Sequence, residues 1–198
     1  MDIHNVLVVS GDPLPGSKVF IPEEEGYAHA IEIDMNKGIY IDPELINPQP
    51  TDFSVGVAGS PEKHPESPNF ESDIHFLKKK IEAGAEYIVT QMFFDNRKFF
   101  EFEKRCRKAG INVPVILGIK PVSTRKQLTY LPKTFNIDMP EELLKEILKC
   151  KNNKEVYELG IEWGIHQVRE LMNPGVPVIH FYTMGRTDNV RKIAEEVF

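Results

Sequence analysis

Short apolar runs that end in turn-forming or polar residues recur along this chain. They show no alternation of polar and apolar positions, which is typical of strands buried on both faces in a parallel sheet. The first run stops at Gly11-Asp12-Pro13, and two later runs end near Ser60 and Gln91. We therefore expect parallel strands at residues 5–10, 53–58, 87–91, 113–118 and 178–182.

Between these runs, apolar residues recur with the spacing of a helix. Ser67 suits an N-cap with Pro68 at the first helical position, and Ala83-Gly84 ends that helix. Asn96 can cap a second helix, which Gly110 stops. Further helices are expected at residues 140–148, at residues 157–172 and from Thr187 or Asp188 to the end. Residues 13–50 are irregular, and we interpret them as a long loop with a short helix around 27–33.

The alternation of strands and helices predicts an α/β fold with a parallel sheet in one domain, residues 1–198. Two architectures share this pattern: a doubly wound sheet and a (β/α)8 barrel of the TIM-barrel type. A complete barrel needs eight strands and typically about 250 residues. The chain is therefore either an open five-stranded sheet or an incomplete ring.

Composition and charge narrow the classes of function. Of 198 residues, 41% are hydrophobic and 27% are charged, as in an ordinary globular domain. A formal charge of -6 argues against nucleic acid as the main partner. The sequence has no apolar run of membrane-spanning length and no signal-peptide pattern, so we expect no membrane partner and a cytoplasmic location. Cys106 and Cys150 are expected to remain reduced thiols.

Known short motifs for metals and nucleotides are missing. The six histidines are scattered, without the spacing of a zinc site, so we expect no metal centre. Neither a dinucleotide-binding glycine fingerprint nor a P-loop is present.

The ends of the predicted strands hold the candidate chemistry, because ligands of parallel α/β proteins bind at that edge. Gln91 is the strongest candidate, since an amide at the tip of a buried strand costs free energy unless something pairs with it. Each other candidate also has a structural interpretation. Asp12 could form an ordinary turn, His64 could serve as a loop cap, and Lys78-Lys79-Lys80 could be a solvated helix face. Phe93, Phe94, Phe99 and Phe100 are interpreted as core residues.

Several motifs together resemble one family. They are Ser10-Gly11-Asp12-Pro13, Val57-Ala58-Gly59-Ser60-Pro61 with His64-Pro65-Glu66, Thr90-Gln91-Met92-Phe93-Phe94-Asp95, and His180-Phe181-Tyr182-Thr183-Met184-Gly185-Arg186. In this order and spacing the chain resembles the methylenetetrahydrofolate reductase family along nearly its whole length. The resemblance implies a (β/α)8 barrel that binds FAD at the C-terminal ends of its strands, of which this chain matches strands four to eight. It also implies reduction of 5,10-methylenetetrahydrofolate to 5-methyltetrahydrofolate, with NADH or NADPH as hydride donor.

The same resemblance assigns roles to individual residues. Asp12 and Gln91 match catalytic positions, and Gln91, Gln127 and Arg186 match folate or nicotinamide positions. The positions that match FAD contacts are Ser10, Gly11, Asp12, Tyr27, Ala28, Ser60, His64, Asp73, Lys79 and Lys80. Two of these depart from the family pattern, which usually has Arg at position 10 and an aromatic residue at position 60.

One catalytic residue of the family has no counterpart here. The family's proton-donating Glu lies on the first barrel strand, and neither Glu62 nor Glu66 replaces it. The alternative is therefore a truncated or degenerate relative that binds flavin, folate or a partner chain without catalysis. An open parallel sheet leaves both edge strands unpaired, so we expect a homo-oligomer or a completing partner chain. A doubly wound domain for another nucleotide is the remaining possibility.

Overall fold

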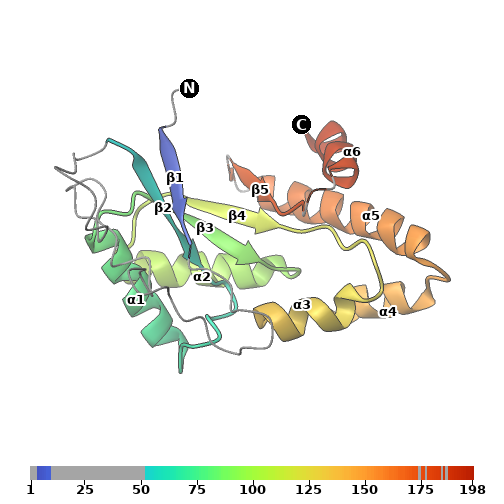
Figure 1. Cartoon of the computed structure of the whole chain (residues 1–198), viewed down its shortest axis with the longest axis horizontal. Helices are drawn as coiled ribbons and strands as arrows, with labels where there is room; N and C mark the ends of the chain where they lie inside the picture. The colour runs from blue at the N-terminus through green and yellow to red at the C-terminus, as the bar shows by residue number, and fades with distance from the viewer. Residues whose placement is uncertain (1–3, 10–51, 174, 177, 184, 186) are drawn as a thin grey trace, which may run out of the picture.

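A computed structural model of the chain describes residues 4–9, 52–173, 175, 176, 178–183, 185 and 187–198 (Figure 1). Within these residues, parallel strands alternate with helices, and two consecutive helices are added before the last helix–strand pair. The predicted α/β class is therefore correct. The long loop and short helix expected within residues 13–50 lie outside the described residues.

The described strands form one parallel sheet whose order in space follows their order in the chain. A doubly wound sheet would reverse its order at a switch point, so that possibility is excluded. Sequential order is the arrangement of a (β/α)8 barrel, and the fold is an incomplete barrel of this type. The strands are β1 (Asn5–Val8), β2 (Ser54–Gly59), β3 (Tyr87–Met92), β4 (Val115–Ile119) and β5 (Ile179–Phe181).

The helices agree with the predicted ones except at some boundaries and in one omission. They are α1 (Phe70–Glu82), α2 (Asn96–Lys108), α3 (Gln127–Phe135), α4 (Glu141–Lys149), α5 (Asn153–Met172) and α6 (Asp188–Val197). The prediction began α5 at Tyr157, one turn late. Asn152 caps α5 by accepting hydrogen bonds from the backbone N–H groups of Lys154 and Glu155.

Two predicted caps were wrong by one or two residues. Asn69, not Ser67, caps α1, because its side chain accepts a hydrogen bond from the backbone N–H of Ser72 at 2.8 Å. Asp95, not Asn96, caps α2 by accepting from the backbone N–H of Arg97 at 2.9 Å. Each true cap is a side-chain oxygen acceptor of the preferred type.

Helix α3 was not predicted, and its sequence explains why. Pro132 lies inside it, where proline normally breaks a helix, and no side chain caps its first turn. Its apolar side chains instead pack with α4, α5 and the end of β3. This cluster buries Met92, Leu131, Leu143 and Val156. Tertiary burial therefore stabilises a helix that local propensity disfavours.

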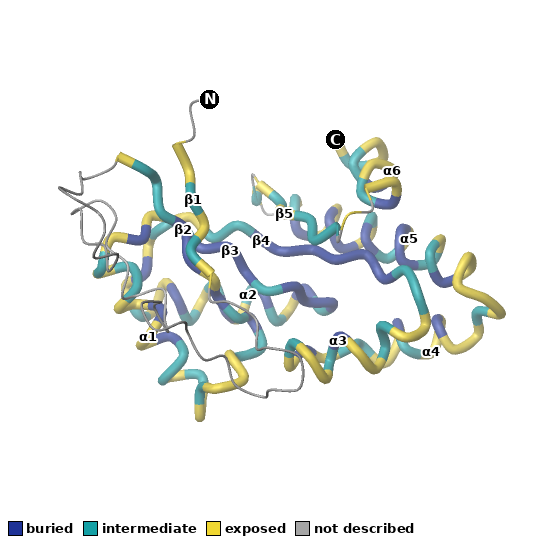
Figure 2. The backbone as a smooth tube through the Cα atoms, in the orientation of Figure 1, coloured by how far each residue is buried: buried dark blue, intermediate teal, exposed yellow. Residues whose placement is uncertain are grey.

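The outer face of the sheet packs against the helices, and buried residues of the central strands β3 and β4 are dark blue in Figure 2. Val57 and Ile88 pack with Leu77 and Phe102 of α1 and α2, and Leu117 packs with Leu171 of α5. Phe93, Phe94 and Phe99 are each at most 1% exposed, which confirms their assignment to the core. Phe100 packs partly buried beside Phe99.

The opposite, inner face of the sheet carries exposed apolar residues at its two edges. Successive residues of a strand alternate between faces, and Leu7 pairs with Gly56, the neighbour of the outward-facing Val57. Leu7 is 39% exposed, Val9 after β1 is 63% exposed, and Val178 before β5 is 50% exposed. The exposed apolar side chains of the inner face thus lie on or beside the edge strands β1 and β5, whereas Val89 of the central strand β3 is only 6% exposed.

Candidate functional site

The C-terminal ends of β3, β4 and β5 place Gln91, Lys120 and Tyr182 at one edge of the sheet. The pairing of β3 with β4 shifts between Val89 and Met92, so Gln91 lies in a bulge. The Gln91 side-chain oxygen Oε1 accepts a hydrogen bond from the backbone N–H of Met92 at 3.0 Å. Its amide nitrogen has no protein acceptor among the described residues, so it can donate to a ligand.

Tyr182 connects these strand ends on the inner side. Its backbone N–H donates to the Ile119 carbonyl at 2.9 Å, which extends the pairing of β4 with β5. Its hydroxyl donates to the Thr90 carbonyl at 2.9 Å, so the side chain crosses β4. A Cβ at Gly118 would lie 2.6 Å from the Tyr182 ring. Glycine at 118 therefore allows the crossing.

Lys120, immediately after β4, is a residue that the sequence analysis missed. It is only 6% exposed, and its Nζ donates to the Tyr182 carbonyl at 3.3 Å. Burial lowers the pKa of this amine, because the charged form loses its hydration. A lone lysine before a proline gives no sequence signal, since its burial comes from distant parts of the chain.

Gln127 stands at the start of α3, and its side chain turns back onto the preceding loop. Its Oε1 accepts hydrogen bonds from the backbone N–H groups of Ser123 at 2.6 Å and Thr124 at 3.1 Å. These bonds fix the oxygen, and the amide nitrogen has no acceptor among the described residues, so it can donate to a ligand. No hydrogen bond between Gln127 and Gln91 exists in the described part of the chain.

Asp73 of α1 organises the loop between β2 and α1, which contains Ser60 and His64. One of its carboxylate oxygens accepts from the backbone N–H of His64 at 3.0 Å, and the other accepts from the Ser67 hydroxyl at 3.2 Å. His64 itself is exposed. The structure thus brings His64 and Asp73 together, with the Asp73 carboxylate used to hold the loop.

Glu62 joins the same loop to the segment that follows α3. Its Oε2 accepts a hydrogen bond from the backbone N–H of Asp138 at 2.6 Å, and Asp138 pairs with Lys98 of α2 at 3.0 Å. The other oxygen, Oε1, is buried without a hydrogen-bond partner among the described residues. Burial raises the pKa of Glu62 to about 7, although the Asp138 N–H and Lys98 both favour the charged form.

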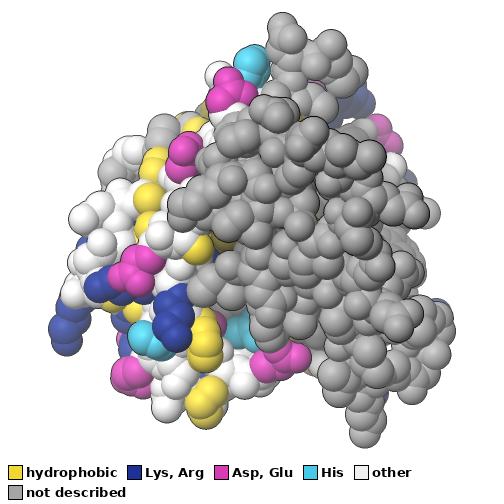
Figure 3. Space-filling model, turned by 60° about the vertical axis from the view of Figure 1, so that its left-hand side comes forward, with side chains coloured by type: hydrophobic (Ala, Val, Ile, Leu, Met, Phe, Trp, Pro, Cys, Tyr) yellow, Lys and Arg dark blue, Asp and Glu magenta, His cyan; other side chains and the backbone are white. Residues whose placement is uncertain are grey.

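The outward side of α1 carries the predicted cations. Lys79 is exposed, with its Nζ 5.5 Å from the ring centroid of Phe76, and Phe76 is itself half-exposed. Burial lowers the pKa of the neighbouring Lys80, while Asp73 opposes that shift. Figure 3, which brings the α1 side of the molecule forward, shows Lys and Arg side chains beside hydrophobic and His side chains. Lys79 is thus the one of these two lysines with a recorded contact to the exposed Phe76 ring.

The remaining predicted site residues lie outside the described residues. They are Ser10, Gly11, Asp12, Tyr27, Ala28 and Arg186. Their proposed roles therefore stay predictions.

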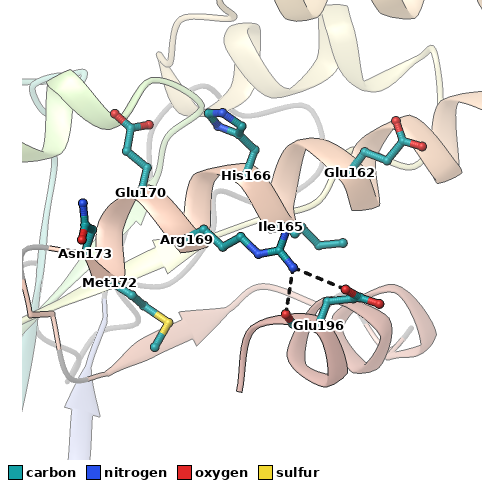
Figure 4. A pocket seen from close by; sticks show the side chains of 8 residues that line it. All are labelled: Glu162, Ile165, His166, Arg169, Glu170, Met172, Asn173 and Glu196. Carbon is teal, nitrogen blue, oxygen red and sulfur yellow. Dashed lines mark hydrogen bonds and ion pairs between the residues drawn. The ribbon is translucent and has the colours of Figure 1, made fainter.

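A hollow of about 960 Å³ lies elsewhere, on the outer surface along α5 and α6 (Figure 4). Arg169 crosses it and donates to the backbone carbonyl of Glu196 at 3.0 Å. Its lining includes Met172 and Asn173, where α5 ends before the chain returns to the start of β5. This end of α5 is remote from the strand C-termini, so we do not assign the hollow to the candidate site.

The described residues contain no group of three or more His, Cys, Asp or Glu side chains placed to hold a metal ion. Their helices are too short or too polar to span a bilayer. Cys106 and Cys150 are both free thiols, as predicted.

Comparisons with known proteins give a consistent family. The family model described as Methylenetetrahydrofolate reductase matches residues 1–197. A probable methylenetetrahydrofolate reductase (NADPH) of Caenorhabditis elegans is 32% identical over all of this chain, which covers 28% of that protein. Methylenetetrahydrofolate reductase (NADH) 1 of Arabidopsis thaliana is 33% identical, with 92% of this chain and 31% of that protein aligned. The 5,10-methylenetetrahydrofolate reductase of Salmonella typhimurium is 37% identical, over 69% of this chain and 47% of that protein.

A solved structure is also similar in fold. It is an uncharacterized protein from Clostridium thermocellum that binds two copies of 5-methyl-5,6,7,8-tetrahydrofolic acid. The TM-score is 0.50 at 20% identity, covering 74% of this chain and 53% of the other. At that identity the likeness supports the fold alone.

The chain spans from 28% to 47% of the length of the three relatives described above. The match nevertheless extends over almost every residue of this chain, including the loops after β2 and β3 that hold the candidate site. We conclude that the chain belongs to the methylenetetrahydrofolate reductase family.

Proposed function

We propose that this chain forms part of a flavin-dependent reductase that converts 5,10-methylenetetrahydrofolate to 5-methyltetrahydrofolate with NADH or NADPH. The observation that carries the proposal is the family match over residues 1–197, with Gln91 placed at the C-terminal end of β3. Relatives named for this reaction carry NADH or NADPH in their names. The C-terminal edge of a parallel barrel is also where its active sites form.

In this proposal the side-chain amides of Gln91 and Gln127 recognise the pterin or nicotinamide ring. The Oε1 atoms of Gln91 and Gln127 already accept backbone hydrogen bonds, so both side chains have fixed orientations. Their amide N–H groups are left to donate to carbonyl oxygens on pterin or nicotinamide. Asp12 and Arg186 would complete the site, with Asp12 near the pterin and Arg186 on a carboxylate tail.

FAD is the proposed cofactor, and α1 supplies residues that fit it. Lys79 and Lys80 would hold the pyrophosphate as point charges, and Phe76 offers an exposed ring to the adenine. Asp73 holds the adjoining loop, in which Ser60 and His64 would contact the cofactor. When bound, flavin supplies a ring that accepts hydride from nicotinamide and delivers it to the folate.

Three further βα units would complete the barrel. The five described strands correspond to barrel strands four to eight, and the missing units would carry the family's proton-donating Glu. The exposed inner residues Leu7, Val9 and Val178 support this proposal, because a closed barrel fills its interior with such side chains. We propose that activity requires these units.

Spectroscopy of the purified chain tests the cofactor. Bound FAD gives the protein the visible absorption of oxidised flavin, and anaerobic NADH or NADPH should bleach it. Gln91→Ala should weaken binding of 5-methyltetrahydrofolate at least tenfold, since a ligand carbonyl then loses its donor. The control is Thr134→Ala at an exposed position of α3, which should bind as the unchanged chain does. Retention of full affinity by Gln91→Ala would contradict the role of this amide.

The second candidate is a chain that binds flavin or folate without catalysis. The exposed apolar residues Leu7, Val9 and Val178 favour it, since exposed apolar surface is typical of a site that binds a ligand or a partner chain. Binding of 5-methyltetrahydrofolate with no hydride transfer from NADH or NADPH, even with FAD added, would support this candidate.

A further inference from the structure

Lys120 is a buried amine that the proposed reaction does not yet use. It follows β4 directly and alternates with Ile119, whose side chain packs in the outer core. Alternation along a strand therefore sends Lys120 toward the inner side. A lysine that is 94% buried is unusual, because burial of an ammonium group costs free energy unless an anion or several acceptors surround it.

The interactions of Lys120 are incomplete within the described structure. Its Nζ can donate three hydrogen bonds, and the described residues supply one acceptor, the Tyr182 carbonyl at 3.3 Å. None of the described carboxylates lies within salt-bridge distance of it. Burial lowers its pKa without an opposing charge from those residues. With respect to the described residues, its remaining donors are free to bind a ligand.

A chain of contacts connects Lys120 with the candidate site. Lys120 binds the carbonyl of Tyr182, and the Tyr182 hydroxyl binds the carbonyl of Thr90, the residue before Gln91. Lys120 at the end of β4 and Gln91 at the end of β3 thus both lie next to the contacts of Tyr182. A ligand group that lies over Tyr182 would come within reach of both residues.

We infer that Lys120 is a ligand-binding residue that donates a charge-assisted hydrogen bond to a carbonyl on the edge of a pteridine-type ring. The link from Lys120 through Tyr182 to the strand end that carries Gln91 favours a ring carbonyl, because the Gln91 amide is the proposed ring-recognition group. Pterin and the flavin ring share this pteridine carbonyl chemistry. The inference rests on the proposed function and adds a residue to its site.

The variants Lys120→Met and Lys120→Gln test the inference in the full chain. Met keeps the length and apolar contacts of the side chain, and Gln keeps a donor without the charge. Lys133→Met, at an exposed position of α3, is the matched control. Far-UV circular dichroism and urea unfolding establish that each variant is folded before binding is measured.

Titrations with 5-methyltetrahydrofolate and with FAD show which ring Lys120 contacts. We expect Lys120→Met to lower the affinity for one of the two ligands at least tenfold and Lys120→Gln to lower it less. Lys133→Met should bind both ligands as the unchanged chain does. Selective loss of folate affinity assigns Lys120 to the pterin, and selective loss of FAD affinity assigns it to the flavin.

A nuclear magnetic resonance titration of the 13C-labelled lysine provides a readout independent of affinity. Binding of the ring should raise the pKa of Lys120, because a carbonyl acceptor favours the charged amine. If the unchanged chain and Lys120→Met bind both ligands equally well while Gln91→Ala does not, the inference fails and the proposed function stands. If the unchanged chain binds neither ligand, both are overturned.

Discussion

The two faces of the sheet differ in burial at the edge strands β1 and β5, although the same strands build both. Outward residues such as Ile88 and Leu117 are fully buried by helices of this chain. Inward residues such as Leu7 and Val178 are apolar yet largely exposed. The difference teaches that the helices of this chain cover the outer face, whereas the described residues leave the inner side of the edge strands exposed. Four predictions test this contrast, from the largest expected effect to the smallest.

A leucine pair compares the two faces directly. Leu117→Ala removes a fully buried side chain and should lower the free energy of unfolding by about 3–4 kcal/mol. Leu7→Ala, on the inner side of the edge strand β1, should lower it by about 1 kcal/mol or less. Urea denaturation measures both values. Equal losses would mean that the inner face is covered in solution.

Two glycines one turn apart in α5 test how tightly the helical layer packs. A Cβ at Gly160 would overlap the backbone carbonyl of Val122, whereas at Gly164 it would lie 2.7 Å from the Ile193 side-chain tip. Gly160→Ala should therefore destabilise the fold by about 2–3 kcal/mol, despite the better helix propensity of Ala. Gly164→Ala should destabilise the fold less, because the Ile193 side chain can move away. Thermal unfolding distinguishes them, and the reverse order would disprove this packing.

Glu62→Gln tests the link between the β2–α1 loop and the segment after α3. The pKa of Glu62 is raised from 4.5 in the unfolded chain to about 7 in the folded chain. The folded state therefore binds more protons between these values, and stability falls as pH rises from about 4.5 to 7. Glutamine keeps an oxygen that can accept from the backbone N–H of Asp138, and it carries no charge.

We accordingly expect Glu62→Gln to be more stable than the unchanged chain at pH 8 by about 1–2 kcal/mol, allowing for solvent screening. At pH 4 the two should unfold at similar urea concentrations. A constant difference across this pH range would show that the Glu62 carboxyl does not titrate as described.

Tyr182→Phe gives the smallest effect, at the inner side of the strand ends. It removes the hydrogen bond to the Thr90 carbonyl and keeps the ring that packs over Gly118. The expected loss of stability is about 1 kcal/mol by urea denaturation. A loss above about 3 kcal/mol would indicate that the inner side is as tightly built as the outer side.

Much of the fold follows from local patterns. Apolar runs predicted every described strand, and helical spacing predicted α1, α2, α4, α5 and α6. The resemblance also led to the correct family. Helix α3 escaped prediction because Pro132 opposes it locally, and its stability comes from packing with α4 and α5.

The candidate site likewise contains residues that the sequence predicted and residues that it did not. Gln91 was predictable, because its position at the end of an apolar run is visible in the sequence. The structure placed it as expected, while its role in catalysis stays a prediction. Lys120 and Glu62 were not predictable, since burial and partners from distant segments decide their charge and their contacts.

The sequence alone therefore determined which segments become strands and helices and which polar residues stand at strand ends, because periodicity and turn residues act over a few neighbours. Only the tertiary structure decided the order of the strands, the bulge at Gln91, the burial of Lys120 and the raised pKa of Glu62. These properties depend on contacts between residues far apart in the chain, and no local pattern encodes such contacts.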